Sequence, residues 1–257
     1  MGQYKDIRVN IERRIGLITI HRAERMNALA KSTFSELVDA SLLLEADPDV
    51  RVIIFTGTGE RAFSAGVDLK ELNDNEKMVH PMGGPSRNLN EIVLEMTKPT
   101  IAAINGVAAG GGCELALACD IRIASSNARI GLPEAKVGMG ANFGSAVLPR
   151  LIPRGAALEM LFTGDLISAQ DACKLGLINH VVGPSELLKH AQALATRIAD
   201  NAPLSIQRMK AVATKGIDLP SAAALRLSVG PDLYNSEDRI EGARAFIEKR
   251  KPQFKGR

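Results

Sequence analysis

The start of the chain alternates apolar and polar positions in two runs, residues 7–11 and 15–20. A period of two places every second side chain on the same face of a strand, so the two runs predict a β-hairpin. Apolar residues then recur at helical spacing over residues 30–44. Asp47-Pro48 ends that run, because proline disfavours helix in the residue before it. The chain is therefore predicted to open with a hairpin followed by a helix.

Strand and helix patterns keep alternating further along the chain. Short apolar runs predict buried strands, and Ser168 with Asp171 three residues later fits a capping box that opens a helix. The predicted strands are residues 50–55, 100–104, 120–124 and 178–182, and the predicted helices are residues 113–119 and 168–175. Residues 72–89 mix Met, Gly and Pro with polar residues and predict an irregular or partly helical excursion, as is common in binding loops.

The pattern changes after Pro184. Apolar residues form a helical stripe over residues 187–198, and Pro203 is placed to open a further helix. From about residue 195 onward we predict helix only. The fold class that follows is α/β, with residues 1–195 as the core that carries the site and residues 196–257 as a helical C-terminal region.

Composition and charge narrow the classes of function. The 32 Lys and Arg exceed the 29 Asp and Glu by only three, far too few for binding nucleic-acid phosphates across a whole face. Aromatic residues make up 4% of the chain, so platforms for stacking bases are scarce. Residues 239–257 hold seven basic and two acidic side chains, a patch that is either a solvated helix face or a contact for a compact anion.

Neither a metal site nor a membrane anchor is indicated. The three cysteines lack C-x-x-C spacing and the four histidines form no ligand cluster, so we expect no disulfide framework, no metal and a reducing compartment. No apolar run approaches the length of a membrane span, and the first residues lack a signal sequence. We therefore expect a cytoplasmic protein with neither nucleic-acid nor membrane partners.

The first segment that could carry chemistry is Ala62-Phe-Ser-Ala-Gly-Val-Asp-Leu69. It differs from the G-x-S-x-G nucleophile elbow only at its first position, but an elbow places its serine directly after a strand, whereas residues 56–61 intervene here. The alternative is a backbone site. Ala-Gly lets a ligand approach the main chain closely, and the N–H after Gly66 can point into a cleft.

The second segment, residues 104–115, contains three consecutive glycines at 110–112 and predicts a strand, a tight turn and a helix start. The free N–H groups and the positive dipole end of a helix N-terminus favour an oxyanion or a phosphate. A dinucleotide-binding fingerprint fails on spacing, because its third glycine would fall on Leu115. Tight packing of the helix against the strand is the structural alternative for these glycines.

Two carboxylates accompany this glycine turn. Glu114 falls in the first turn of the predicted helix, and Glu134 follows Pro133, 20 residues further on. Each one taken alone fits a structural role, since acidic side chains favour the first turn of a helix. Together, beside an oxyanion-binding turn, they are what protonation and water activation next to a carbonyl would require.

Four segments carry a similarity to a known family. They are Ala62-Phe-Ser-Ala-Gly-Val-Asp-Leu-Lys70, Lys98-Pro-Thr-Ile-Ala-Ala-Ile-Asn-Gly106, Gly110-Gly-Gly-Cys-Glu114-Leu-Ala116 and Ser168-Ala-Gln-Asp-Ala172. The similarity extends over essentially the whole chain, from residues 15–29 to residues 243–252. On these residues the chain resembles the enoyl-CoA hydratase/isomerase (crotonase) family.

The resemblance implies a right-handed spiral of ββα units capped by C-terminal helices that mediate trimerisation, often as a dimer of trimers. It also implies that the backbone N–H groups of Val67 and Gly111 form an oxyanion hole for the thioester carbonyl. Glu114 would help to activate water for attack at C3 and Glu134 would supply the proton to C2, with the split of acid and base duties left open. Isomerase members typically keep only the later acid, so the presence of both favours hydration.

The resemblance also implies contacts along coenzyme A. Main-chain groups near residues 65–68 would hold the adenine end, cations would meet the phosphates, and an aromatic side chain from the same or a neighbouring subunit would line the groove. The residues so assigned are Ala65, Asp68 and Leu69, the four cations Arg25, Arg61, Lys70 and Lys249, and the aromatic Phe246. An ordinary solvated side chain is the alternative for each cation.

One departure from the family pattern concerns the acyl site. Hydratases usually continue after the second glutamate with Pro-Gly-x-Gly-Gly, whereas this chain has Gly138-Met-Gly-Ala-Asn-Phe-Gly-Ser145. Asn142 thus takes the place of a small glycine. It is either a satisfied turn residue or a hydrogen-bond partner for a polar acyl group.

The sequence therefore predicts an enoyl-CoA hydratase, a lyase of fatty-acid metabolism that adds water to a trans-2-enoyl-CoA. CoA is part of the substrate, and no metal or redox cofactor is expected. The alternatives are other reactions through a thioester enolate, namely double-bond isomerisation, hydration coupled to carbon–carbon cleavage, or decarboxylation. A non-catalytic CoA-binding or RNA-binding role is disfavoured, because binding alone needs neither carboxylate.

Overall fold

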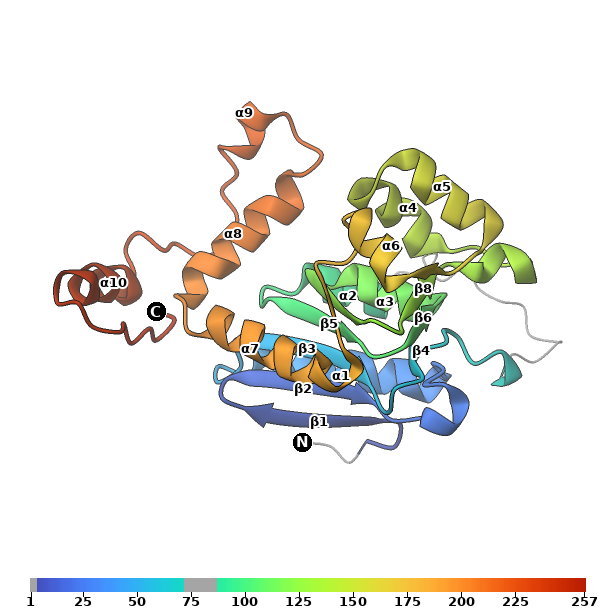
Figure 1. The fold of residues 1–257 in the computed structure, drawn as a ribbon. Helices are drawn as coiled ribbons and strands as arrows, with labels where there is room; N and C mark the ends of the chain where they lie inside the picture. The colour runs from blue at the N-terminus through green and yellow to red at the C-terminus, as the bar shows by residue number, and fades with distance from the viewer. Residues whose placement is uncertain (1–3, 72–86) are drawn as a thin grey trace.

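Ten strands form two sheets in the computed structural model, which describes residues 4–71 and 87–257 (Figure 1). The strands are β1 (Ile7–Glu12), β2 (Ile15–Ile20), β3 (Val52–Gly57), β4 (Ala62–Ser64), β5 (Thr100–Ile104), β6 (Val107–Ala109), β7 (Ile121–Ser125), β8 (Arg129–Gly131), β9 (Ile167–Ser168) and β10 (His180–Val182). The larger sheet has the order β1-β2-β3-β5-β7-β10 and the smaller the order β4-β6-β8-β9. Pairings are parallel except at β1–β2 and β8–β9.

The chain alternates between the two sheets. The pairs β3/β4, β5/β6 and β7/β8 each place their first strand in the larger sheet and their second in the smaller one. Helices follow these pairs and cover the sheets. They are α1 (Lys31–Ala46), α2 (Leu89–Glu95), α3 (Gly111–Ala118), α4 (Asn142–Leu151), α5 (Arg154–Thr163), α6 (Ala169–Lys174), α7 (Leu187–Ala199), α8 (Pro203–Gly216), α9 (Ser221–Ala224) and α10 (Glu237–Ile247), with 3-10 turns η1 (Ala23–Arg25), η2 (Leu69–Glu71), η3 (Pro133–Val137) and η4 (Pro184–Glu186).

The predicted hairpin and most of the predicted elements are present. Arg13 and Arg14 both have positive φ, 50° and 67°, which is the backbone of the tight type I′ turn that matches strand twist. Strands and helices begin and end within a few residues of their predicted bounds. Ser168 caps α6 as predicted, since its hydroxyl accepts the N–H of Asp171.

The core lies on both faces of the larger sheet. Strand β3 is buried along its whole length: Ile53 and Phe55 belong to the main core with α1 and α3, whereas Val52 and Ile54 pack against α7. A central parallel strand with helices on both sides reads as a continuous apolar run for this reason. Burial on both faces explains why residues 52–55 are all apolar.

Two aspects of the prediction differ from the structure. Helix does not continue through the whole C-terminal region, because residues 225–236 and 248–257 are not helical. Gly230-Pro231 and Pro252 account for this, since proline lacks the N–H that a helix needs. The boundary at residue 195 lies inside α7, so the division into two regions stays a prediction. The short strands of the smaller sheet were not predicted, because a run of two or three residues is too short to show an alternation of apolar and polar positions.

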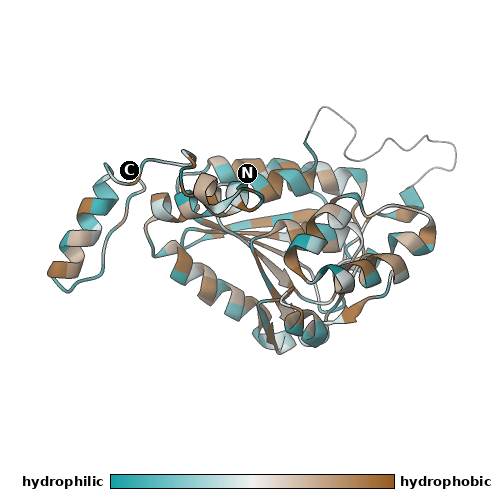
Figure 2. Cartoon of the chain, turned by 90° about the horizontal axis from the view of Figure 1, so that it is seen from above, coloured by the Kyte–Doolittle hydropathy of each residue, from teal (hydrophilic) through white to brown (hydrophobic). Residues whose placement is uncertain are grey.

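The excursion predicted over residues 72–89 lies largely outside the described residues, and Leu89 begins α2. Helices α8, α9 and α10 extend away from the sheets in Figure 1, and the chain ends beside α10. Figure 2, seen from above, shows one helix beside the C-terminus standing apart from the rest of the molecule. Among the described residues, no helix is long and apolar enough to cross a membrane.

Candidate active site

A cavity of about 340 Å³ lies where α2, α3, η3 and the start of α4 meet the loop after β4. Both predicted carboxylates and both predicted oxyanion donors line it. The full lining is Phe34, Ala65, Gly66, Val67, Leu69, Asn88, Leu89, Asn90, Gly110, Gly111, Glu114, Pro133, Glu134, Lys136, Val137, Met139, Gly140, Asn142 and Phe143. The cavity is therefore assembled from segments that lie far apart in the sequence.

Glu114 extends from the first turn of α3, as the sequence predicted. Its Oε1 accepts the backbone N–H of Gly144 at 2.8 Å, and its Oε2 accepts the side-chain amide of Asn90 at 3.4 Å. Burial raises the pKa of Glu114 to about 7, the Gly144 hydrogen bond opposes this, and the charge of Glu134 adds to it. This carboxyl can therefore take up or release a proton near neutral pH.

Glu134 lies in η3, directly after Pro133. Burial raises the pKa of Glu134, and its Oε2 is buried with no hydrogen-bond partner. A Cβ atom added to Gly110 would lie 3.3 Å from Glu134 Oε1, so the carboxyl group sits against the glycine turn. A second carboxyl group with a raised pKa thus faces the same cavity.

The backbone N–H groups of Val67 and Gly111 lie beside each other. A Cβ atom added to Gly111 would be 3.8 Å from the amide nitrogen of Val67. Gly111 is the first residue of α3, where N–H groups lack partners within the helix. Leu29 forms an isolated parallel bridge with Val67. In this bridge the N–H of Leu29 donates to the carbonyl of Gly66, and the N–H of Asp68 donates to the carbonyl of Leu29. The N–H of Val67 therefore points away from Leu29. Two donors are therefore available to one oxygen atom.

Gly66 makes this close approach possible. Its φ is +90°, and a Cβ atom at this position would lie 2.8 Å from the carbonyl oxygen of Ala109 and 3.1 Å from the nitrogen of Gly111. No side chain fits there. The neighbouring Ser64 hydroxyl accepts the N–H of Gly66 at 3.1 Å and is fully buried, so it stabilises the turn and is not exposed as a nucleophile.

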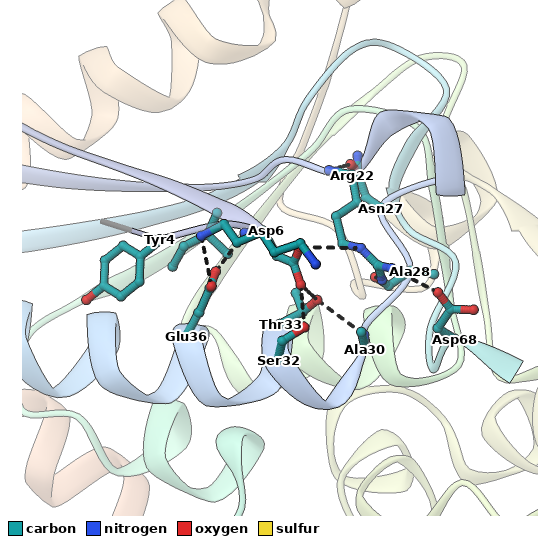
Figure 3. A network of polar contacts seen from close by, with 12 residues as sticks. Tyr4, Asp6, Arg22, Asn27, Ala28, Ala30, Ser32, Thr33, Glu36 and Asp68 are labelled. Atoms are coloured by element: carbon teal, nitrogen blue, oxygen red, sulfur yellow. Dashed lines mark hydrogen bonds and ion pairs between the residues drawn. The ribbon is translucent and has the colours of Figure 1, made fainter. Parts of the chain in front are cut away.

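A buried polar network supports the loop that carries Val67 (Figure 3). The Arg22 guanidinium lies 3.1 Å from Asp68 and 3.7 Å from Asp6, and it also donates to the carbonyl of Ala28 at 2.6 Å. Although burial opposes ionisation, hydrogen bonds from Ser32 and Thr33 and the charge of Arg22 lower the pKa of Asp6. The network fastens the segment before α1 to the residue that follows Val67.

Comparison with known proteins shows the family to which the chain belongs. A family model described as enoyl-CoA hydratase/isomerase matches residues 10–257. The chain belongs to this family. It is 38% identical over 255 residues to a crotonyl-CoA hydratase of Syntrophomonas wolfei, with 98% of each chain covered. It is 40% identical over 256 residues to an (E)-benzylidenesuccinyl-CoA hydratase of Thauera aromatica, covering 97% of this chain and 99% of that one.

Solved structures of the family share the fold. The crystal structure of an enoyl-CoA hydratase from Bacillus anthracis superposes with a TM-score of 0.89 at 35% identity, covering 98% of this chain and 100% of the other. An enoyl-CoA hydratase from Mycobacterium tuberculosis gives a TM-score of 0.88 at 36% identity, covering 98% and 99%. The predicted crotonase-like α/β fold is thus confirmed, and the chain is an enzyme of the crotonase type.

The structure brings most of the predicted site residues together. Seven of them line the cavity, namely Ala65, Val67, Leu69, Gly111, Glu114, Glu134 and Asn142. The Asp68 side chain instead pairs with Arg22 and is buried, while its main-chain N–H donates to Leu29 and its carbonyl accepts the N–H of Glu71. Arg25, Arg61 and Lys70 are exposed side chains outside the cavity lining.

Phe246 and Lys249 lie apart from the cavity of their own chain. Phe246 lies in the last turn of α10 and Lys249 follows two residues after this helix, which Figure 1 places apart from α2, α3 and α4. The Phe246 side chain is 86% exposed. Contact between these two residues and a ligand in the cavity would therefore require a second subunit.

Asn142 is the first residue of α4, and its side-chain amide donates to the carbonyl of Gly140 at 3.2 Å. It is thus partly satisfied by the turn, while it still lines the cavity. Two partners of Glu114 were not predicted from the sequence, Asn90 and the N–H of Gly144. The Asn88-x-x-Glu91 capping box could have placed Asn90 in a first helical turn, but nothing in the sequence shows that α2 faces α3.

Proposed function

We propose that the protein adds water across the C2–C3 double bond of a trans-2-enoyl-CoA. The observation that supports this is the cavity in which two carboxyl groups with raised pKa values face two adjacent backbone N–H groups. The names of the similar hydratases are consistent with it. A protein that only binds CoA would need neither carboxyl group.

In this proposal the thioester oxygen accepts hydrogen bonds from the N–H groups of Val67 and Gly111. Preset donors stabilise the negative charge that develops on this oxygen as the enolate forms. Ionised Glu114 takes one proton from the attacking water as its oxygen bonds to C3, and protonated Glu134 gives its proton to C2. The product gains one OH at C3 and one H at C2, and exchange with solvent resets both carboxyl groups. A base with a pKa of about 7 suits work at neutral pH.

The test is to add the purified protein to crotonyl-CoA and to measure the loss of the enoyl absorbance. We expect 3-hydroxybutyryl-CoA as the product. Product analysis with 3-enoyl and aryl-propenoyl thioesters separates hydration from isomerisation and from carbon–carbon cleavage. The proposal is overturned if no 2-enoyl-CoA is hydrated while one of the other thioesters is converted.

We further propose that the protein is a homotrimer or a dimer of trimers held together by residues 196–257. Large apolar side chains are exposed along this region, and contiguous exposed apolar surface is typical of interfaces. They are Met209, Ile217, Leu219, Leu225, Tyr234, Ile240, Phe246 and Ile247. In such an assembly Phe246 and Lys249 would contact the CoA of a neighbouring subunit, while Arg25, Arg61 and Lys70 would meet its phosphates. Light scattering of the purified protein tests the assembly.

Three statements remain predictions from the sequence. They are the cytoplasmic location, the part played in fatty-acid metabolism, and the independence from metal and redox cofactors. Among residues 4–71 and 87–257, no three His, Cys, Asp or Glu side chains are grouped so that they could hold a metal ion. Assay of the enzyme after dialysis against a chelator tests the independence from metal directly, with unchanged activity as the expected result.

A further inference from the structure

Asn90 carries a polar atom that the fold leaves without a partner. In the described part of the chain, three buried side-chain atoms have no hydrogen-bond partner: Ser41 Oγ, Asn90 Oδ1 and Glu134 Oε2. An unpaired buried oxygen destabilises a protein, because it has lost its water without gaining a donor. Two of the three atoms belong to residues that line the cavity. The unpaired oxygen indicates that Asn90 has a role other than stabilising the fold.

The nitrogen of the same Asn90 amide indicates what this role is. Its Nδ2 donates to Oε2 of Glu114 at 3.4 Å, while the side chain is only 8% exposed. The position of Asn90 is set by the capping box of α2, in which Asn88 Oδ1 accepts the N–H of Glu91 and the Glu91 carboxylate accepts the N–H of Asn88. The contact therefore joins a fixed helix start to the carboxylate of α3.

Glu114 is consequently held from two sides. The N–H of Gly144, in α4, binds Oε1, and the amide of Asn90, in α2, binds Oε2. With both oxygens bound, rotation of the carboxylate about its terminal torsion is restricted, and that torsion is otherwise soft. A catalytic group needs to be held to within a fraction of an ångström of its productive position.

We propose that Asn90 is a positioning residue for water addition, whose side-chain amide holds the Glu114 carboxylate in its reactive orientation. The inference rests on the proposed function. Asn90 does not need to touch the substrate in this role. It acts through Glu114, and its unpaired oxygen is the cost of bringing an amide N–H to that carboxylate within an otherwise apolar helix face.

A hydrogen bond to the ionised carboxylate favours that form, so removal of Asn90 should raise the pKa of Glu114. The other groups that face Glu114 stay unchanged in such a variant. They are Glu134 from η3, the neighbouring Cys113 thiol on α3, and the N–H groups of Phe143 and Gly144 from α4, while Lys136 of η3 lines the same cavity but pairs with Asp165. Burial raises the pKa of Cys113, so this thiol remains neutral.

The experiment compares Asn90→Leu and Asn90→Ala with wild type and with Ser41→Ala as the matched control. Ser41 is also buried with an unpaired oxygen, but it lies in α1 outside the cavity lining. Steady-state kinetics with crotonyl-CoA give kcat and KM, and a ¹³C NMR titration of glutamate carboxyl groups gives the pKa of Glu114. The alanine variant covers the case in which leucine prevents folding.

We expect kcat to fall about 10- to 100-fold in both Asn90 variants, with KM changed by less than about threefold. The pKa of Glu114 should rise by roughly one unit, and Ser41→Ala should change neither quantity. An unchanged Glu114 pKa, or an unchanged kcat, in a folded Asn90 variant overturns the inference. If wild type fails to hydrate crotonyl-CoA while the Asn90 variants still shift the Glu114 pKa, the proposed function fails and the contact itself stands.

Discussion

The backbone N–H of Gly144 donates to Glu114 Oε1 at 2.8 Å and so ties the start of α4 to a carboxylate on α3. A carboxylate that accepts backbone hydrogen bonds usually has a lowered pKa. Here burial has the larger effect, and the pKa of Glu114 rises to about 7. The chemistry and the stability of the protein should therefore both change across neutral pH.

The first prediction concerns the rate. If Glu114 is the base and Glu134 the acid, kcat/KM should rise with pH up to about 7, because the free enzyme must carry Glu114 in its ionised form, and should fall again at higher pH as Glu134 loses its proton. Glu114→Gln should lower kcat about 100- to 10,000-fold, as is typical of a lost acid or base. Glu186→Gln, an exposed residue of η4, is the matched control and should behave as wild type. A Glu114→Gln enzyme with wild-type kcat would assign the base elsewhere.

The second prediction concerns stability and follows from the same pKa. The folded protein holds the Glu114 proton up to about pH 7, whereas the unfolded chain releases it near the ordinary value of 4.5. The raised pKa of Glu114 therefore adds roughly 3 kcal/mol to the free energy of unfolding. This contribution is complete below about pH 4.5 and is lost as the pH rises through 7. Glu134, whose pKa is also raised, acts in the same direction. Urea unfolding at constant protein concentration should show this decline of stability with rising pH, and the decline should be smaller in Glu114→Gln. A wild-type stability that rises between pH 6 and 8 would contradict the burial of this group.

The third prediction tests the geometry of the two N–H donors. Gly66→Ala would place a methyl group 2.8 Å from the carbonyl oxygen of Ala109, at a φ of +90°, and should displace the N–H of Val67. Loss of one oxyanion donor commonly lowers kcat about 100- to 1,000-fold. Gly176→Ala is the control, since Gly176 also has positive φ, +80°, but has no atom within 4 Å of the added Cβ. Equal losses of kcat in the two variants would show that backbone strain, and not the site, is responsible.

The body of the fold could be predicted from the sequence because its strands and helices are long enough to show a period. Strand β3 is a continuous apolar run, and α7 carries a clear apolar stripe. The smaller sheet could not be predicted, since β4, β6 and β8 have three residues each and are rich in Ala and Gly. Their pairing is decided by the tertiary structure, which overrides local preference.

The residues of the candidate site also differ in whether the sequence could predict them. Glu114, Gly111 and Val67 could be predicted because each lies in a glycine-rich turn that has a chemical meaning on its own. The partners of Glu114 could not, since Gly144 lies 30 residues away and Asn90 lies 24 residues away in sequence. Contacts between separate helices depend on how the helices pack, and a single sequence does not specify that.

The fourth prediction concerns the network around Arg22. Arg22→Ala would leave Asp6 and Asp68 buried without the cation that pairs with both. Breaking a buried pair in this way typically costs about 3–5 kcal/mol. Urea unfolding should show such a loss, and kcat should fall as well, because Asp68 follows Val67 and its N–H binds Leu29.

A second substitution checks this interpretation. Adding Asp68→Asn to Arg22→Ala removes one of the uncompensated charges and should restore part of the lost stability. The salt bridge between Lys174 and Asp171, which is exposed on both sides, provides the comparison, and Lys174→Ala should cost less than about 1 kcal/mol. A double variant that is less stable than Arg22→Ala alone would show that Asp68 stabilises the loop independently of Arg22.

The last prediction links assembly to substrate binding. Phe246 is 86% exposed at the end of α10 and lies far from the cavity of its own chain, so both of its proposed roles depend on a neighbouring subunit. Phe246→Glu should therefore lower the oligomeric state in light scattering and raise KM for crotonyl-CoA in parallel, while the thermal unfolding of the core changes little. Leu42→Glu, at a 52% exposed position of α1, is the control and should change neither quantity. A raised KM in an intact oligomer would mean that Phe246 contacts the CoA directly, and an altered oligomer with unchanged KM would separate assembly from binding.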